Sequence, residues 1–447
     1  AIGLDGGVVD ATGQSTVTVE VGAGEGGFAV ELVAVLVGCG TGSAGSADGN
    51  PAPETQGAQS TGSVESSTDG GGAFVVSADA PEGGAGEYAA PELPADLQNQ
   101  SPPPGARGQF ITDFSRATIS YDQVMSGGPP KDGIPSVDDP KFVSVSEADS
   151  WIAEDESVQV VSVGSGEERQ THIYPIQILM WHEIVNDVVG GRPVTVTYCP
   201  LCNTGIAFDR RFDGRVLDFG TTGRLRYSNL IMYDRQTETW WQQATGRAVA
   251  GAYAGGRLQM VPMLTLSWSD AMDEYPDARV VSKDTGFNRS YGRNPYRGYD
   301  TAERPFLYRG PTDDEFSPMT RVVTVFHNDS SEAFPYPTLR EEQVVTASIG
   351  GDAIAVFWAP GTASPLDTGS TGDGRDVGTA NAFFARADGR ELSFGVEDGE
   401  IVDEQTGSTW DVGGRATRGP LAGTRLDPVT TSQHFWFSWT AFEQESG

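Results

Sequence analysis

The chain has 447 residues, enough for roughly two or three domains with sizeable cores. Its formal net charge is −33, and Lys131, Lys141 and Lys283 are its only lysines. The sequence has no basic stripe that could neutralise phosphates, which argues against a nucleic-acid partner. Acid-rich, lysine-poor composition is typical of proteins kept soluble in high salt, because salt screens the self-repulsion of the charges. A mesophilic protein with acidic linkers is the alternative.

The first 38 residues are a candidate leader region that ends just before Cys39. The apolar run from Leu32 to Gly38, followed by Cys39, resembles a lipoprotein signal in which this cysteine is lipidated after cleavage. Glu31 borders the run, and no basic residue precedes it. We expect an extracytoplasmic, cell-surface protein held on the membrane through a lipid on Cys39. A free surface cysteine in a flexible tail is the alternative, and no stretch reaches the roughly 18 apolar residues of a membrane span.

Residues 39–106 are dominated by Gly, Ser, Ala, Pro, Asp and Glu. Such a segment buries too little apolar surface to offset the entropy lost on ordering. The composition therefore predicts a disordered acidic tether.

From residue 107 onward, short runs of aromatic and β-branched residues separated by Gly, Asp and Asn predict a folded, mainly β region. The expected strands are Val158–Val163, Val194–Tyr198, Arg215–Phe219 and Val322–Phe326, with hairpin turns at Asp213-Gly214 and Asp388-Gly389. The expected helices are short: Glu147–Ala153, Pro175–Val185, Trp268–Glu274 and Trp439–Glu443, with Ser146 and Thr171 as candidate caps.

An internal repeat organises this region. Gly191–Pro200 aligns without a gap on Gly351–Pro360, and Asp213–Gly220 aligns on Asp388–Gly395. Further matches, in the same order, are Asp234-x-x-Thr237 with Trp241 on Asp403-x-x-Thr406 with Trp410, and Ser267-Trp268 on Ser438-Trp439. The repeat predicts a mainly β (α+β) fold of two duplicated small antiparallel barrel or sandwich units with short helices. The units span residues 107–275 and 321–447, and an irregular insert rich in Arg and Tyr spans residues 276–320.

The repeat also separates features of the fold from features of function. The Asp-x-x-Thr and Trp positions occur in both copies, so they indicate turn geometry and core anchors, with the Trp N–H bonded to the turn. The cysteines occur in copy one alone: Cys199 aligns with Ala359, and Cys202 with Thr362. Because the fold does not require these two sulfurs, we expect them to have a chemical role.

The Cys199-Pro-Leu-Cys202 motif permits three interpretations. It can be a metal site for copper or zinc, with His182 as a further ligand, accompanied by Glu183, Asn186 and Asp187 on the same run, and with His172, Met180 or Met232 as other candidates. It can be a catalytic dithiol–disulfide couple formed by Cys199 and Cys202, with the first thiol as the favoured nucleophile. It can also be an inert structural disulfide outside the cell.

His182 and the insert are the other polar features. His182 lies in Trp181-His-Glu-Ile-Val-Asn-Asp187, and copy two has no histidine at that place, although a structural histidine remains the alternative. The second histidine of a zinc-protease helix is missing. In the insert, Arg289, Arg293 and Arg297 alternate with tyrosines, and we expect a compact structural loop rather than a carboxylate- or phosphate-binding site.

These motifs together resemble one family, the domain-of-unknown-function family numbered 3179, which is common in haloarchaea and also found in bacteria. The likeness covers roughly residues 108–446 and rests on His-Glu-x-x-Asn-Asp, Thr-Tyr-Cys-Pro-Leu-Cys-Asn-Thr and Gly-Arg-Asn-Pro-Tyr. It implies a secreted or lipid-anchored protein and no particular reaction. A fainter similarity of residues 403–423 to Rieske-type barrels concerns the fold alone, because the ligand set of an iron–sulfur cluster is absent.

The leading hypothesis from the sequence is an extracytoplasmic protein that binds or delivers copper or zinc through Cys199, Cys202 and His182. Thiol–disulfide exchange by the same cysteines and a structural cell-surface role are the alternatives. No nucleotide or iron–sulfur cofactor is expected. A redox or metal-exchange partner and any enzymatic activity are left open.

Overall fold

The structure, a computed structural model, describes residues 8–9, 15–19, 30–32 and 88–446, apart from the side chains of 8–9, 15–19, 30–32, 167 and 444–446. The chain divides into two compact units, Ala1–Ala78 and Asp79–Gly447. In the first unit, β1 (Val8–Val9), β2 (Ser15–Val19) and β3 (Val30–Leu32) form an antiparallel sheet in the order β1-β2-β3. Cys39 and residues 39–87 of the expected tether lie outside the described residues.

The second unit begins with irregular structure that leads into copy one. It comprises η1 (Ala95–Leu97), η2 (Ala106–Gly108), η3 (Tyr121–Gln123), β4 (Val124–Ser126), β5 (Val137–Asp138), β6 (Phe142–Ser144) and α1 (Val145–Ala148). Residues 88–106, which composition assigns to the tether, therefore contain one short 3₁₀ turn, η1, and the first residue of another, η2. Phe110 and Phe114 of this segment pack edge-on against Trp240.

Copy one is a run of short strands with two helices. Its elements are β7 (Ser157–Val163), η4 (Gly166–Glu168), β8 (Gln170–Pro175), α2 (Ile176–His182), β9 (Ile184–Val189), β10 (Arg192–Cys199), η5 (Pro200–Cys202), β11 (Thr204–Asp209), β12 (Arg211–Phe212), β13 (Arg215–Val216), β14 (Phe219–Arg226), β15 (Asn229–Asp234), β16 (Trp240–Gln242), β17 (Ala248–Ala250), β18 (Met260–Val261), β19 (Leu264–Ser267) and α3 (Trp268–Glu274).

Copy two follows β20 (Arg279–Val281) and the insert, which contains η6 (Tyr299–Thr301). Its elements are β21 (Arg321–His327), β22 (Ser330–Pro335), α4 (Tyr336–Glu342), β23 (Val344–Ile349), β24 (Asp352–Ala359), β25 (Thr379–Phe384), β26 (Arg386–Ala387), β27 (Arg390–Glu391), β28 (Phe394–Glu397), β29 (Glu400–Asp403), β30 (Thr409–Trp410), β31 (Ala416–Arg418), β32 (Thr430–Phe435) and α5 (Trp436–Ser446). Apart from η4, η5 and β18, each element of copy one has a counterpart here in the same order, so the repeat and the mainly β fold class are confirmed.

Several local predictions hold, and others shift by a few residues. The helix Trp268–Glu274 is found with the expected bounds, and the Asp213-Gly214 and Asp388-Gly389 turns connect tight hairpins. The predicted helix Pro175–Val185 is wrong at its end, because Glu183 adopts φ 57° and the chain continues as a strand. Strand Arg215–Phe219 is broken between β13 and β14.

Two capping predictions and one match of the repeat are also wrong. The α1 cap is Ser144, whose side chain accepts from Glu147 N, and Thr171 lies within β8. The Ser438-Trp439 match is out of register by three residues, since Trp436 begins α5 as Trp268 begins α3.

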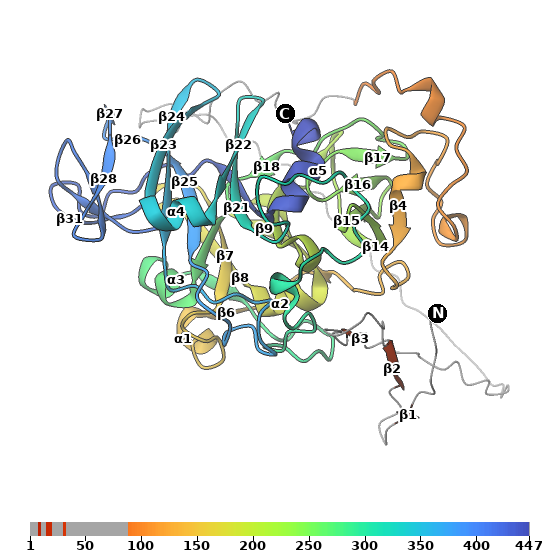
Figure 1. Ribbon diagram of the computed structural model, residues 1–447, viewed down its shortest axis with the longest axis horizontal. Helices are drawn as coiled ribbons and strands as arrows, with labels where there is room; N and C mark the ends of the chain where they lie inside the picture. The colour runs from red at the N-terminus through yellow and green to blue at the C-terminus, as the bar shows by residue number, and fades with distance from the viewer. Residues whose placement is uncertain (1–7, 10–14, 20–29, 33–87, 447) are drawn as a thin grey trace, which may run out of the picture. The chain divides into compact units, whose positions relative to one another are not determined.

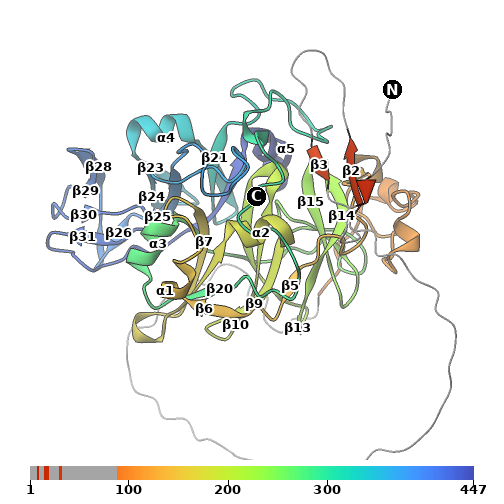
Figure 2. The same ribbon diagram turned by 90° about the horizontal axis from the view of Figure 1, so that it is seen from below.

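The two copies are interlocked. One sheet has the order β22-β21-β32-β11-β10-β9-β5, so strands of copy two continue directly into strands of copy one through the Gly205–Gln433 pair. Reciprocally, β25 of copy two meets β19 of copy one, where Thr265 N donates to Asn381 Oδ1 (2.9 Å) and Thr379 Oγ1 donates to Thr265 O (2.7 Å). Figures 1 and 2 place the β14–β17 sheet and the β28–β31 sheet at opposite ends of this unit.

The motif shared by both copies is part of the fold, as the sequence predicts. Asp234 accepts hydrogen bonds from Thr237 N (2.7 Å) and Trp241 Nε1 (2.9 Å). Asp403 accepts the same two bonds in copy two, from Thr406 N (2.7 Å) and from Trp410 Nε1 (3.0 Å). A buried carboxylate therefore joins a turn to a tryptophan in each copy.

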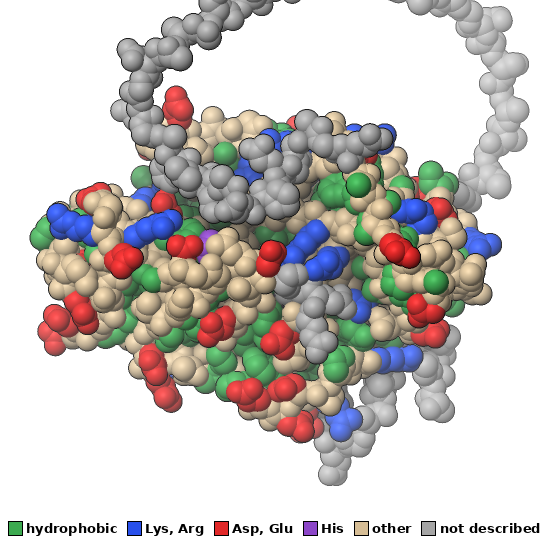
Figure 3. All heavy atoms as spheres, turned by 90° about the horizontal axis from the view of Figure 1, so that it is seen from above, with side chains coloured by type: hydrophobic (Ala, Val, Ile, Leu, Met, Phe, Trp, Pro, Cys, Tyr) green, Lys and Arg blue, Asp and Glu red, His purple; other side chains and the backbone are tan. Residues whose placement is uncertain are grey.

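Acidic and basic side chains are interspersed on the face of the molecule seen in Figure 3, where Lys and Arg side chains lie between those of Asp and Glu. Within the described segments, no helix has the length and apolar character needed to cross a membrane.

Candidate functional site

The Cys-Pro-Leu-Cys motif forms the tight turn between β10 and β11. Cys199 is the last residue of β10 and pairs with Thr204, so four residues close the turn. Pro200 begins the 3₁₀ turn η5, where its fixed φ is suitable, and Asn203 ends it with φ 50°. Asn is one of the few residue types that tolerate this left-handed conformation. The local sequence therefore brings the two cysteines to one short turn.

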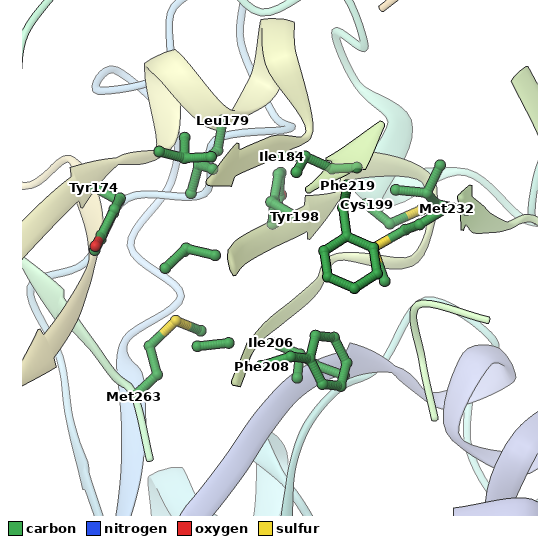
Figure 4. Packing of buried hydrophobic residues seen from close by; sticks show 14 of the residues in the cluster. Tyr174, Leu179, Ile184, Tyr198, Cys199, Ile206, Phe208, Phe219, Met232 and Met263 are labelled. Carbon is green, nitrogen blue, oxygen red and sulfur yellow. The ribbon is translucent and has the colours of Figure 1, made fainter. Parts of the chain in front are cut away.

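Both thiols are free and buried. Cys199 is 2% exposed, Cys202 is fully buried, and Cys199 Sγ donates to Ser228 O at 3.6 Å. Figure 4 shows Cys199 beside Phe219 and Met232 in the apolar core of copy one. Burial raises the pKa of the Cys199 thiol well above its ordinary value, and the neighbouring Cys202 raises it further. The Cys199 thiol is therefore neutral near neutral pH.

Glu183 lies beside the end of the strand that carries Cys199. It follows α2 directly, and its carbonyl accepts from Tyr198 N at 2.8 Å, so it lies across from the end of β10. The residue as a whole is 8% exposed, and its carboxyl oxygens are not among the buried side-chain atoms that lack a hydrogen-bond partner in the described part of the chain. Burial first, and the Cys199 thiol second, raise the pKa of Glu183 well above its usual range.

The equivalent place in copy two keeps the backbone and lacks both reactive groups. Gln343 adopts φ 59°, close to the φ 57° of Glu183, and its carbonyl accepts from Trp358 N at 2.8 Å. The residue after Trp358 is Ala359, the counterpart of Cys199. Copy one thus replaces a Gln and an Ala with a carboxyl group and a thiol.

His182 is engaged elsewhere. Its Nδ1 donates to Pro135 O (2.7 Å), which leaves Nε2 to accept from the Tyr291 hydroxyl (2.7 Å). Burial lowers the pKa of His182 to about 4, so the ring is neutral. With both nitrogens bonded, His182 would have to break a hydrogen bond before it could bind a metal held by the sulfurs.

The other candidate ligands are similarly placed in the core. His172 Nδ1 bonds Asp187 Oδ2 at 2.7 Å, and that carboxylate also accepts from Tyr174. Met180 and Met232 belong to the same buried cluster as the cysteines. In the part of the chain that the structure describes, no group of three or more His, Cys, Asp or Glu side chains is disposed to hold a metal ion.

The insert covers the cysteine turn. Tyr296, Tyr299 and Tyr308 pack against the copy-one core, and Tyr299 donates its hydroxyl proton to Leu201 O, inside the motif, at 2.9 Å. Burial raises the pKa of Tyr299, and the nearby Cys202 raises it further. The tyrosines are therefore the outer wall of the site, while Arg293 and Arg297 are exposed.

An ion-pair cluster ties this cover to copy two. Asp300, with a fully buried side chain, pairs with Arg321 (3.2 Å) and Arg375 (2.9 Å), and accepts from Ser364. These charges lower the pKa of Asp300 although its burial opposes the change. Arg375 and Ser364 belong to the loop 360–378, which is the enlarged counterpart of the cysteine turn. The insert is thus held by the loop that replaces the site in copy two.

Fold and site together define a duplicated, mainly β protein with a buried dithiol in one copy. The family described as "Protein of unknown function (DUF3179)" matches residues 131–446, and the chain belongs to this family. Comparison with curated proteins and with solved structures gave no match.

Sequence reasoning found the two cysteines and considered Glu183 only as a neighbour of the candidate ligand His182. The signal was present in the gap-free alignment of the repeat, where Glu183 falls on Gln343 and Cys199 on Ala359. The tyrosines of the insert were identified as structural, and only the fold reveals that they lie over the cysteines.

Proposed function

We propose that the protein is a thiol–disulfide redox protein whose Cys199 and Cys202 alternate between a dithiol and an intramolecular disulfide. The observation that supports this best is the presence of two free thiols at one tight turn of copy one, where the matching turn of copy two begins with Ala359 and has no sulfur. Thiol–disulfide exchange needs two thiols that can close an intramolecular disulfide, and the short turn holds Cys199 and Cys202 near each other.

The reaction is an exchange with an external disulfide. The two S–H bonds of Cys199 and Cys202 and the external S–S bond break. One internal S–S bond and two external S–H bonds form, so that two electrons pass to the external disulfide and both thiol protons end on the released thiols. Since both cysteines are buried, the partner reaches them when the tyrosine cover over Leu201 moves.

A second candidate is the binding or delivery of copper, as Cu(I), by the same sulfurs. The specific observation in its favour is the thioether of Met232 beside Cys199 in a dry, apolar cluster, because soft sulfur donors suit Cu(I). Zinc would need further ligands, and His182 becomes one only by leaving Pro135 or Tyr291. This candidate needs no redox change of the cysteines.

The deciding experiment uses full-length protein with Cys39→Ser, so that only two thiols are counted. Equilibration with glutathione buffers of increasing oxidation should convert both thiols to one disulfide in a single two-electron transition. Cys199→Ser and Cys202→Ser should each abolish it. Metal analysis of the same reduced samples, with the Cys199→Ser/Cys202→Ser variant as control, tests copper and zinc. Two thiols that stay reduced in every buffer would overturn the redox proposal, and equal metal contents in both proteins would overturn the metal candidate.

The location of the protein is a separate proposal. We propose a halophilic, extracytoplasmic lipoprotein anchored through Cys39, supported by the apolar run before this cysteine and by the net charge of −33. Growth with a labelled fatty acid should label the protein, and Cys39→Ser should remove the label and release the protein from membranes. A label retained in the variant would contradict this proposal.

A further inference from the structure

We propose that segment 285–309 of the insert is a docking surface for an acidic polypeptide that carries the external disulfide. The proposal rests on the redox function proposed above and adds to it the chemical class of the partner. It comes from the outer side of this segment, whose inner side is the tyrosine cover of the cysteine turn.

The two sides of the segment differ in chemistry. Tyr296, Tyr299 and Tyr308 pack against the copy-one core, and the Tyr299 hydroxyl donates to Leu201 O. The five arginines of the segment are not buried: Arg293, Arg297, Arg304 and Arg309 are exposed, and Arg289 is half-buried. Because the tyrosines fix the insert on the core, the arginines are not needed for that purpose.

These five arginines lack the acidic partners that many other arginines of the chain have. Outside the insert, nine arginines form ion pairs with Asp or Glu side chains, as Arg192 does with Asp209 at 2.8 Å. Within the described part of the chain, no hydrogen bond or ion pair involves the side chain of an arginine in segment 285–309. The chain has 62 acidic residues, so their absence here is a property of this surface.

The segment is also a local excess of positive charge. It contains five arginines and two acidic residues, Asp300 and Glu303, a formal charge of +3 in a chain of −33. The Asp300 side chain is fully buried and already paired with Arg321 and Arg375. One exposed carboxylate therefore stands among five guanidinium groups at this surface.

Unpaired arginines beside exposed aromatic rings fit an acidic polypeptide. A guanidinium group holds a carboxylate through two parallel hydrogen bonds, and such contact pairs are screened by salt less than distant charges are. Phe287 and Phe306, which are 43% and 39% exposed, add apolar contact area on the same segment. Arginine and aromatic side chains are the types enriched at protein–protein interfaces.

Other anionic occupants fit this surface less well. A lipid surface carries no disulfide, and its extent would bring it against the acidic remainder of the chain. A small anionic disulfide offers no apolar surface to Phe287 and Phe306. A polypeptide whose disulfide is flanked by Asp and Glu offers the disulfide, the carboxylates and the apolar contacts together.

The docking surface is bonded directly to the cover of the site. Phe306 N donates to the Tyr299 hydroxyl at 3.2 Å, and that hydroxyl donates to Leu201 O at 2.9 Å. Ser228 Oγ donates to Phe306 O, and Ser228 O accepts from Cys199 Sγ at 3.6 Å. A partner that displaces Phe306 therefore loosens contacts of Leu201 and of Ser228, the hydrogen-bond partner of Cys199.

The first test uses the reduced Cys39→Ser protein and three synthetic peptides with the same intramolecular disulfide, flanked by glutamates, glutamines or lysines. Formation of the Cys199–Cys202 disulfide is followed at one salt concentration at which the protein is folded. The glutamate peptide should react fastest and the lysine peptide slowest. The net charge of −33 by itself favours the lysine peptide, so the reverse order, or equal rates, overturns the proposal.

The second test identifies the arginines that act. Arg293→Gln/Arg297→Gln removes two charges from the docking surface, and Arg215→Gln/Arg390→Gln removes two exposed arginines outside the insert. Both variants change the net charge equally. The ratio of the glutamate-peptide rate to the glutamine-peptide rate should fall about 5-fold in the first variant, because exposed ion pairs contribute modestly each. The second variant should keep the wild-type ratio, and an equal fall in both overturns the proposal.

The outcomes separate the partner from the redox function. If peptides oxidise wild type at rates independent of the flanking residues, the docking surface alone fails. If no peptide oxidises it, the redox function fails, and fluorescence anisotropy of the labelled glutamate peptide tests docking. Wild type should bind this peptide more tightly than Arg293→Gln/Arg297→Gln does, and equal binding overturns the docking surface.

Vesicles of anionic lipid test the membrane as the alternative occupant. Arginine-dependent binding to vesicles, without arginine-dependent binding of the glutamate peptide, overturns the proposal. If Arg293→Gln/Arg297→Gln does not fold, the order of the three peptides with wild-type protein decides.

Discussion

The turn after β10 and the loop after β24 follow equivalent strands of the two copies, but they differ in length and in role. In copy one, four residues (200–203) close a tight turn that holds two thiols. In copy two the strand ends in Ala359, and nineteen residues (360–378) intervene before β25. The enlarged loop holds the insert that covers the first turn. One copy has kept the short turn and acquired reactive groups, and the other provides the support for their cover.

This difference teaches how to separate scaffold from chemistry without other sequences. Groups that recur at equivalent places, such as Asp234 and Asp403, make the same hydrogen bonds and belong to the fold. At places where the two copies have the same backbone geometry but different side chains, such as Glu183 and Gln343, the fold does not dictate the side chain. The predictions below test this division.

The largest effect is expected for Asp300→Ala, which removes the tie between the insert and the enlarged loop. Arg321 would lose its buried partner, and breaking such a pair costs about 3 to 5 kcal/mol. We expect lower stability in urea unfolding and faster alkylation of Cys199 and Cys202, because the cover over them loosens. Asp300→Asn keeps part of the hydrogen bonding, so its stability and its alkylation rate should lie between those of the wild type and of Asp300→Ala. Alkylation at the wild-type rate would contradict the role of the insert as a cover.

Asp234→Ala and Asp403→Ala should be matched in effect. Each leaves a buried tryptophan N–H and a turn N–H without an acceptor, at a cost of about 2 to 3 kcal/mol. Denaturant unfolding of both variants measures this. A large loss in one copy only would break the equivalence of the copies.

Glu183→Gln should flatten the pH dependence of stability. The pKa of Glu183 is raised in the folded state, so its contribution to stability is greatest below its unfolded pKa and is lost as pH rises toward its folded pKa. The variant should therefore gain stability relative to wild type above about pH 5, by about 1.4 kcal/mol for each unit of the shift. Unfolding free energies at pH 5 and pH 8 test the sign, and a relative loss at pH 8 would contradict it.

Glu156→Gln serves as the comparison for that measurement. Burial raises the pKa of Glu156 to about 7, so wild-type stability should fall between about pH 4.5 and 7 for the same reason. The variant should remove that part of the slope while leaving the chemistry of the cysteines intact.

The smallest effect is expected for Gly214→Ala and Gly389→Ala. Both glycines have positive φ, 68° and 72°, and a methyl group would meet no atom within 4 Å at either. The cost is therefore that of the backbone alone, about 1 kcal/mol in each copy. Thermal unfolding of the pair should give equal shifts, and unequal shifts would indicate that the hairpins differ in packing.

Much of the fold could be predicted because local sequence patterns specify many of its strands and turns, and because the same patterns occur in both copies. Alternating apolar residues revealed β7, β10 and β21, and Asp-Gly pairs revealed two hairpins. The end of α2 could not be read, because Glu183 is not a residue type that usually stops a helix by turning left-handed. The exchange of strands between copies was also out of reach, since sequence periodicity carries no information on which edges meet.

The site was predictable in part for the same reason. Two rare cysteines at one strand end are visible in the sequence, as is their absence from copy two. The engagement of His182 by Pro135 and Tyr291 depends on residues 47 and 109 positions away, which no local pattern specifies. Because these hydrogen bonds cannot be seen in the sequence, the metal hypothesis treated His182 as a free ligand.

The pairing of strands between the two copies has a consequence for folding during synthesis on the ribosome. Thr204 of β11 bonds His434 of β32, 230 positions later, and that bond lies at the edge of the cysteine turn. In a newly made copy one, β18 can pair with Ala207 and Phe208 of β11, but the end of β11 beside the cysteine turn still lacks its partner strand. That end must wait for nearly the whole chain before it is paired. During synthesis this side of the cysteine turn is open, and β32, the last strand to be made, is the one that closes it.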